Sequence, residues 1–240
     1  GHTGACGRTQ KEIGVVKMYT TYAEIVGEIT GMLRDLKRVI VAIDGMACSG
    51  KSYLAGALAA QFPHTCVIRM DDFYLPQSER TAERMAQPGG HMDTVRFADE
   101  VAMPLWKAAL PAYAPFDCHT QTFGETVNPA PDTELFIVEG TYALHPEIPD
   151  IYDLRIFVEC DEEVRLRRLA EREGEGAAAF ADEWITREAH YFESYMTREL
   201  ADMIYDGTDP DTTLETDAPA EGMADLLPYR KGEDQDDHKT

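Results

Sequence analysis

Short apolar runs alternate with segments of helical periodicity along residues 22–206. Strand-like runs rich in β-branched side chains occur at 39–43, 66–70, 135–138, 154–158 and 203–205. Helical spacing or composition predicts helices over 25–36, 51–61, 94–109, 161–173 and 181–200. Strands that alternate with helices predict parallel βαβ units. We therefore expect an α/β fold with a mostly parallel five-stranded sheet and helices on both of its faces.

Two stretches lack this regularity. Residues 75–92 contain Pro76, Pro88 and two adjacent glycines, which predict a loop with at most a short helix. Residues 111–133 hold four prolines and predict irregular structure. The sequence contains no internal repeat.

A glycine-rich segment follows the first predicted strand and opens the next helix. It runs from Gly45 to Ser52, GMACSGKS, and matches the phosphate-binding P-loop pattern GxxxxGK(S/T). Glycines let backbone N–H groups turn toward phosphate oxygens, and the helix N-terminus adds partial positive charge. Lys51 would bridge the β- and γ-phosphates of ATP. We therefore predict a three-layer P-loop NTPase fold, with nucleotide contacts from Gly45, Met46, Ala47, Cys48, Ser49, Gly50, Lys51, Ser52 and Tyr53.

The predicted strand at 135–138 ends at an acidic residue, Glu139. An apolar strand followed by an acid is the Walker B pattern, in which the carboxylate helps to hold Mg²⁺ beside the P-loop. The alternative is an ordinary glutamate at a strand end. Because a P-loop is also present, we favour the metal role and expect Ser52 and Glu139 to be ligands of Mg²⁺.

The next question is what the nucleotide acts on. A GTPase should carry an NKxD motif, but the only asparagine, Asn128, lies in the sequence NPAP. A kinase needs an acid that accepts the proton of the acceptor hydroxyl. Asp71 lies just past the predicted strand at 66–70, and ligands of open parallel sheets bind beyond the carboxyl ends of the strands. We therefore expect Asp71 to face the same crevice as the P-loop and to act as the base.

A cluster of arginines lies on the predicted helix at 161–173. Arg165, Arg168 and Arg172 are three and four residues apart and share one face. Such a helix can form a small lid whose arginines neutralise the transferring phosphoryl group, with a hinge at Gly174. The alternative is a salt-bridged surface helix, and we favour the lid.

The balance of charge restricts the partners of this protein. Its 240 residues hold 22 Lys and Arg against 44 Asp and Glu, a net charge of −22. Such an excess argues against nucleic acid and against an anionic membrane surface as partners. No apolar run is long enough for a transmembrane helix. We expect a small-molecule substrate, and a homo-oligomer remains open.

Composition also divides the chain. Residues 206–240 hold eleven acidic and three basic residues, which predicts a disordered acidic tail over 207–240. Residues 1–17 are interpreted as an N-terminal extension or cloning remnant, which leaves 18–206 as the P-loop domain. The five cysteines are scattered without a CxxC pair, which favours reduced thiols, a cytoplasmic location and no zinc site.

Several motifs in order resemble the uridine kinase family of P-loop kinases. They are the P-loop and the strings MDDFYLP, ERMAQPGGHMDTVRFADEV, FIVEGTYALHP and YDLRIFVECDEEVRLRRLAERE, within residues 39–200. The resemblance implies that Asp71 is the catalytic base and that Asp93 binds ribose hydroxyls. It places Phe116 where the family has a tyrosine beside the base, and His119 near a base-contacting histidine. Arg168 would reach the substrate and Arg172 would belong to the lid.

These observations predict an ATP- and Mg²⁺-dependent kinase that phosphorylates the 5′-hydroxyl of a nucleoside. Asp71, Lys51, Arg168 and Arg172 would be catalytic, and Tyr74 would pack on the substrate. Phe116 removes a hydroxyl, and apolar contacts discriminate weakly, so the acceptor stays open. The alternatives are a related kinase for another hydroxylated metabolite, such as a sugar phosphate or pantothenate, and a non-catalytic nucleotide-binding regulator.

Overall fold

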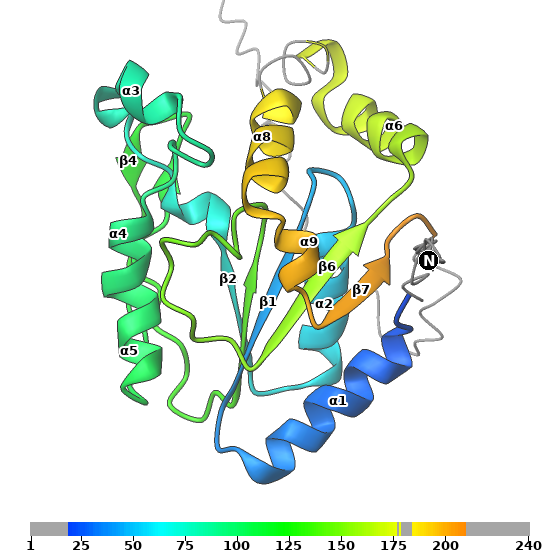
Figure 1. The fold of residues 1–240 in the computed structure, drawn as a ribbon. Coiled ribbons are helices and arrows are strands. Elements are labelled where there is room, and N and C mark those ends of the chain that lie inside the picture. The colour runs from blue at the N-terminus through cyan, green and yellow to red at the C-terminus, as the bar shows by residue number, and fades with distance from the viewer. Residues whose placement is uncertain (1–18, 177, 179–183, 210–240) are drawn as a thin grey trace, which may run out of the picture.

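The computed structural model describes residues 19–176, 178 and 184–209. Its centre is a five-stranded parallel sheet with the strand order β2-β5-β1-β6-β7. The strands are β1 (Val39–Gly45), β2 (Thr65–Arg69), β5 (Leu135–Glu139), β6 (Leu154–Glu159) and β7 (Met203–Asp206). Helices lie on both sides of this sheet (Figure 1), which confirms the predicted three-layer α/β architecture.

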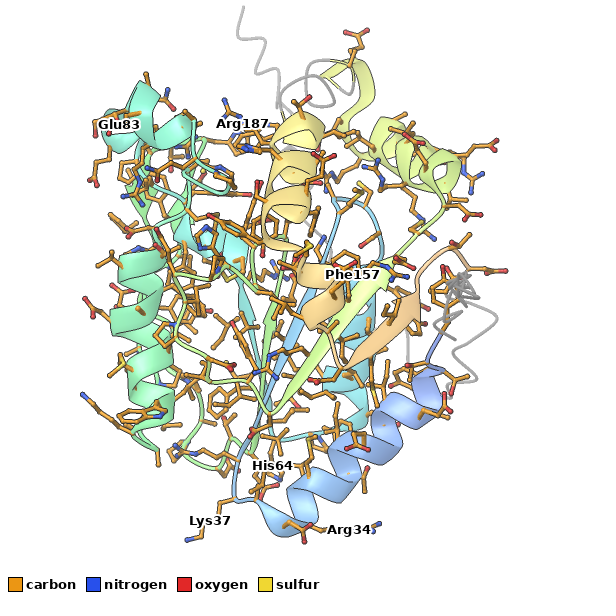
Figure 2. All side chains as sticks on the ribbon, in the orientation of Figure 1. Arg34, Lys37, His64, Glu83, Phe157 and Arg187 are labelled. Carbon is orange, nitrogen blue, oxygen red and sulfur yellow. The ribbon has the colours of Figure 1, made fainter. Side chains whose placement is uncertain are left out.

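The alternation of side chains along β1 explains the two layers. Val39, Val41 and Ile43 pack with α1 (Tyr22–Asp35) and α2 (Lys51–Gln61) on one face. The even-numbered residues between them pack on the opposite face with the chain that follows β2 and with α8 (Thr186–Tyr195). Because all of β1 is buried, its residues 39–43 form a continuous apolar run rather than an alternating one. Sticks in Figure 2 fill both sides of the sheet.

The expected helix over 94–109 forms in three pieces. These are α4 (Thr94–Phe97), the π-helical segment η3 (Ala98–Ala102) and α5 (Met103–Trp106). Pro104 lies in the first turn of α5, where it has no N–H to donate to the preceding helix. The helix ends at Trp106, three residues earlier than its apolar spacing predicts, and Ala108 just beyond it is left-handed with φ of 57°.

The loop at 75–92 is largely as expected. It holds two short turns of helix, η2 (Gln77–Glu79) and α3 (Ala82–Met85), after the 3₁₀ turn η1 (Met70–Phe73). The segment at 111–133 contains a small antiparallel hairpin of β3 (Phe116–Asp117) and β4 (Thr122–Phe123), which the sequence did not predict. Its strands are too short to give a periodic signal.

The last helical region is divided as well. The predicted helix over 181–200 becomes α8 and α9 (Thr197–Leu200), because Met196 adopts a left-handed conformation with φ of 47°. Residues 181–183 lie outside the described part of the chain, as do the lid residues 177, 179 and 180. The helix predicted over 161–173 forms as α6 (Glu162–Glu173) and is followed by a 3₁₀ turn, η4 (Gly174–Gly176), while its role as a lid stays a prediction.

The packed chain runs past residue 206, the predicted end of the domain. Gly207 N donates to the Glu159 carbonyl at 2.8 Å, and Thr208 Oγ1 accepts from Asp161 N at 3.0 Å. The predicted extension at 1–17 and the tail from 210 onward lie outside the described residues. Within the described ranges, no helix combines the length and apolar character needed to cross a bilayer.

Candidate active site

The P-loop connects β1 to α2 and is shaped by three left-handed residues. Gly45, Cys48 and Gly50 have φ values of 145°, 61° and 107°. A Cβ at Gly45 would overlap the Val158 carbonyl oxygen on the neighbouring strand, so only glycine fits there. The loop therefore depends on contact with β6 as well as on its own sequence.

The beginning of α2 can accept an anion. Its N-cap residue, Gly50, has no side chain to satisfy the first N–H groups, which leaves them for a ligand such as a phosphate. The Lys51 side chain is buried, and its Nζ donates to the Met46 carbonyl across the loop at 2.7 Å. The other predicted nucleotide contacts, residues 45–52, all lie on this loop or at the start of α2. Tyr53 instead packs against the apolar core on the α2 side.

Ser52 and Glu139 lie together, as the predicted metal role requires. The Ser52 hydroxyl is 3.1 and 3.2 Å from the two Glu139 carboxylate oxygens. Burial raises the pKa of Glu139 to about 7, helped by the negative charge of Asp71 and opposed by Lys51 and Ser52. A buried carboxylate beside a hydroxyl is an oxygen donor set that suits Mg²⁺, so these residues fit the ion.

Asp71 lies at the same edge of the sheet. β2 and β5 are neighbours in register, with Arg69 opposite Glu139, and Asp71 follows in η1 just beyond that end. Its side chain is exposed and accepts a hydrogen bond from the Tyr74 hydroxyl at 3.0 Å. The carboxylate is therefore oriented and open to a ligand, two properties that a general base needs.

Helix α8 supplies a site residue that the sequence did not indicate. Glu188 is buried, and its carboxylate accepts from the P-loop amide of Ala47 at 2.9 Å. Burial raises its pKa, while Lys51 and the Ala47 amide act in the opposite direction. Helix α8 is thus hydrogen-bonded to the P-loop through Glu188. No local signal could have found this contact, since 141 residues separate its partners.

The three arginines of α6 that were predicted to act in a lid lie in different surroundings. Arg165 is buried, and its positive charge opposes the rise that burial causes in the pKa of Glu188. Arg168 donates to the Gly207 and Thr208 carbonyls at 2.8 and 2.9 Å and to the Cys48 carbonyl at 3.4 Å. It therefore joins α6, the end of β7 and the P-loop. Its reach toward a substrate stays a prediction.

Arg172 lies near the end of α6. Its Nε contacts Glu173 Oε1 at 2.8 Å, and its charge also acts on the thiol of Cys48 in the P-loop. The thiol pKa nevertheless rises, because burial outweighs the nearby positive charge. Arg172 is thus close enough to the P-loop to influence it.

The predicted nucleoside contacts lie apart from the P-loop, around the β3–β4 hairpin. Asp93 caps α4 by accepting from Arg96 N at 3.0 Å and pairs with Arg96 Nε at 3.5 Å. Phe116 is buried, and its ring packs against Phe123 with centroids 5.2 Å apart. His119 is exposed on the hairpin turn. The packing of Phe116 makes it a core residue in this structure.

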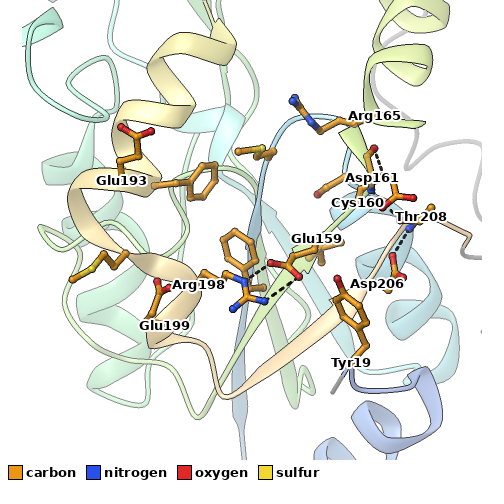
Figure 3. A pocket seen from close by; sticks show the side chains of 16 residues that line it. Tyr19, Glu159, Cys160, Asp161, Arg165, Glu193, Arg198, Glu199, Asp206 and Thr208 are labelled. Carbon is orange, nitrogen blue, oxygen red and sulfur yellow. Dashed lines mark hydrogen bonds and ion pairs between the residues drawn. The ribbon is translucent and has the colours of Figure 1, made fainter. Parts of the chain in front are cut away.

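A cavity of about 480 Å³ lies between the ends of β6 and β7 and the helices α8 and α9. Figure 3 shows Glu159 and Arg198 paired on its wall, with Tyr19 below them. Met46 and Ser49 place it against the P-loop, on the α8 side of the sheet. Asp71 and Tyr74 are not among its lining residues, so it is separate from the site around the predicted base.

The known proteins whose sequences are similar to this chain include kinases. The uridine kinase of Streptococcus mutans is 26% identical over 199 residues, which cover 80% of this chain and 90% of the relative. Human nicotinamide riboside kinase 2 is 31% identical over 140 residues, 55% of this chain and 56% of that protein. The chain resembles the uridine kinase-like P-loop kinases. No protein-family model matches it.

Two solved structures share the fold. A Bacillus stearothermophilus protein described as a possible uridine kinase superposes with a TM-score of 0.60 at 18% identity, over 77% of this chain and 97% of its own. A candidate fructose transport system kinase from Silicibacter gives 0.57 at 24% identity, over 78% and 98%. At these identities the likeness concerns the fold, and it confirms the predicted P-loop architecture.

Proposed function

We propose that this protein is an ATP- and Mg²⁺-dependent small-molecule kinase of the uridine kinase type. The observation that carries the proposal is the position of Asp71, an open carboxylate beyond β2 at the sheet edge that also holds Glu139 and the P-loop. Binding of a nucleotide alone needs no such acid. The names of the relatives suggest the 5′-hydroxyl of a nucleoside as acceptor.

In the proposed reaction, the acceptor oxygen forms a bond to the γ-phosphorus of ATP while the bond to the β,γ-bridging oxygen breaks. Asp71 accepts the hydroxyl proton, and ADP leaves with the electron pair. The Tyr74 hydroxyl orients the carboxylate. Lys51 and the N-terminus of α2 stabilise the phosphate charge, and Arg172 would add positive charge. Bound Mg²⁺ would neutralise phosphate oxygens, held by Ser52 and Glu139.

Asp71→Asn tests the proposed base. The substitution removes the proton acceptor but leaves the P-loop intact, so turnover should fall by about 100- to 10,000-fold while ATP affinity stays unchanged. ADP release and a nucleotide titration measure the two quantities. Asp72→Asn is the control, because its carboxyl interacts with Tyr113 and not with Tyr74. Equal turnover in wild type and Asp71→Asn would refute the assignment.

A second candidate acceptor is a hydroxylated metabolite other than a nucleoside, because Phe116 lacks the hydroxyl of the tyrosine that the uridine kinase family has there, and apolar contacts discriminate weakly. A screen of ADP release across nucleosides, polyols and their phosphates distinguishes the acceptors. The absence of acceptor-dependent turnover with every compound would favour the non-catalytic regulator.

A further inference from the structure

Arg80 places a positive charge beside the proposed acceptor position. It is half-buried in the loop after η2. Its Nε donates to the Leu75 carbonyl at 2.8 Å and its Nη2 to Cys118 Sγ at 3.3 Å. No carboxylate in the described part of the chain forms an ion pair with it. A positioned guanidinium without a counter-ion is suited to bind an anion.

Tyr74 connects this charge to the proposed base. Its ring lies under the guanidinium of Arg80, with 5.8 Å between Cζ and the ring centroid, and its hydroxyl donates to Asp71. A small acceptor whose hydroxyl meets Asp71 can therefore extend along this ring toward Arg80. Asp71 and Arg80 belong to the same segment of the chain, residues 71–80.

The β3–β4 hairpin supports the same interpretation. The hairpin is tied to this loop by the bond from Arg80 to Cys118 and by Gln77 N, which donates to Gln121 Oε1 at 2.8 Å. Phe116, the aromatic ring that the resemblance places beside a nucleobase, is buried at the same hairpin against Phe123. Arg80 therefore places a cation on the hairpin side of the proposed acceptor position.

His91 lies beside Tyr74 on the same aromatic wall. The imidazole is buried, with its ring 5.4 Å from that of Tyr74. Burial, followed by the charges of Arg80 and Arg187, lowers its pKa to about 3, so it stays neutral. Figure 2 shows Arg187 between α8 and α3, and its Nη1 donates to the Met85 carbonyl. Two arginine charges therefore act on the same aromatic wall.

We propose that the acceptor of this kinase carries an anionic group, a carboxylate or a phosphate, which binds Arg80 while its hydroxyl faces Asp71. The inference rests on the proposed function and specifies its substrate class. It makes Arg80 a residue that determines specificity, and it favours an anionic hydroxylated metabolite over a neutral nucleoside.

Matched acceptors test this proposal. ADP release is measured with pantothenate against panthenol, ribose 5-phosphate against ribose, and uridine, using the full-length protein. We expect turnover with an anionic member, and the two anionic arms distinguish carboxylate from phosphate. Arg80→Gln should raise the KM for that acceptor about tenfold or more, since a charge-assisted hydrogen bond is lost, and leave the ATP KM unchanged. Arg80→Lys should recover part of the loss.

Arg38→Gln is the matched control. Arg38 is also half-buried, bonds to backbone carbonyls of Ala108 and Ala109 and lies over the Phe136 ring, but it precedes β1 at the opposite end of the sheet. The Arg38→Gln substitution should leave the KM for ATP and for every acceptor unchanged.

Isothermal titration of the same anionic compounds in the presence of ADP measures binding without turnover. Turnover confined to neutral acceptors, or equal anion affinity in wild type and Arg80→Gln, would overturn the inference and leave the kinase proposal standing. No turnover with any compound would refute the kinase proposal itself.

Discussion

Asp44, at the end of β1, is a fully buried carboxylate on which three parts of the molecule converge. It accepts from Gly45 N at 2.7 Å, from Leu144 N at 3.0 Å and from the Tyr191 hydroxyl at 2.8 Å. Burial raises its pKa to about 6, and these donors oppose the rise. One side chain thus fixes the P-loop entrance, the chain after β5 and helix α8, which is why its loss would affect the whole site.

Tyr191→Phe tests this arrangement through pH. The native pKa of Asp44 exceeds the unfolded value of about 3.9, so the native state binds more protons and the free energy of unfolding falls as pH rises from about 4 to 6. Loss of the hydroxyl raises the Asp44 pKa further and extends this fall to higher pH. We expect a destabilisation of about 1–3 kcal/mol at pH 8 and a smaller one at pH 5. Urea denaturation measures both.

The control for this pH dependence is Tyr195→Phe. The residue lies on the same helix, with its ring against Tyr191 and His145. Its substitution should cost the same at both pH values. A Tyr191→Phe effect that is equal at pH 5 and pH 8 would mean that the hydroxyl does not stabilise the ionised carboxylate.

At the scale of elements, the end of β7 and the P-loop are in direct contact. A Cβ on Gly207 would overlap the Ser49 carbonyl oxygen, and Gly207 N is bonded to the end of β6. Arg168 donates to the next carbonyls and brings α6 into the same junction. The conformation of the P-loop therefore depends on a strand that begins more than 150 residues later.

Gly207→Ala should push the P-loop and the end of β7 apart. Because the obstructing atom belongs to the backbone, the P-loop or β7 must shift, and we expect a loss of about 1–3 kcal/mol in stability and weaker ATP binding. Thermal unfolding and a nucleotide titration measure the two effects. Gly31→Ala is the control, since its Cβ would meet nothing within 4 Å inside α1. Unchanged ATP affinity in Gly207→Ala would show that the contact does not shape the loop.

For the whole molecule, the net charge of −22 contrasts with a ligand that would be a polyanion. Attraction then has to come from a local positive region made by the P-loop amides, Lys51 and the arginines of α6. Arg80 would extend that region to the acceptor. The negative remainder of the surface disfavours nucleic acid, whose binding requires an extended basic face.

Two truncations test where the functional chain ends. Ending the chain after Asp209 removes the acidic segment but keeps Gly207 and Thr208, so turnover and the ATP KM should match the full chain. Ending it after Asp206 removes two carbonyl acceptors of Arg168 and should lower both stability and ATP affinity. Activity lost in the longer variant would assign a role to residues 210–240. Wild-type behaviour of the shorter one would make the junction dispensable.

The sequence by itself determined the parts whose signals are local. The β-branched runs predicted the strands, and the P-loop pattern predicted the phosphate-binding loop before α2. The acids after β2 and β5 were assigned to one edge of the sheet because parallel strands share a carboxyl end. Ser52 and Glu139 meet as expected. The strands and the P-loop depend on residues within a few positions of one another, so periodicity and spacing suffice. The meeting of Ser52 and Glu139, 87 residues apart, followed from the rule that parallel strands share a carboxyl end.

Only the tertiary structure decided the roles of Glu188, Asp44 and Arg80. Each has a partner on a distant element: Ala47 for Glu188, Leu144 and Tyr191 for Asp44, and Cys118 for Arg80. The break at Met196 and the inward packing of Phe116 belong to the same class, since neither position carries a local signal. The physical reason is that burial and long-range hydrogen bonds are set by how elements pack, whereas a pattern along the chain reports only which face of an element is apolar.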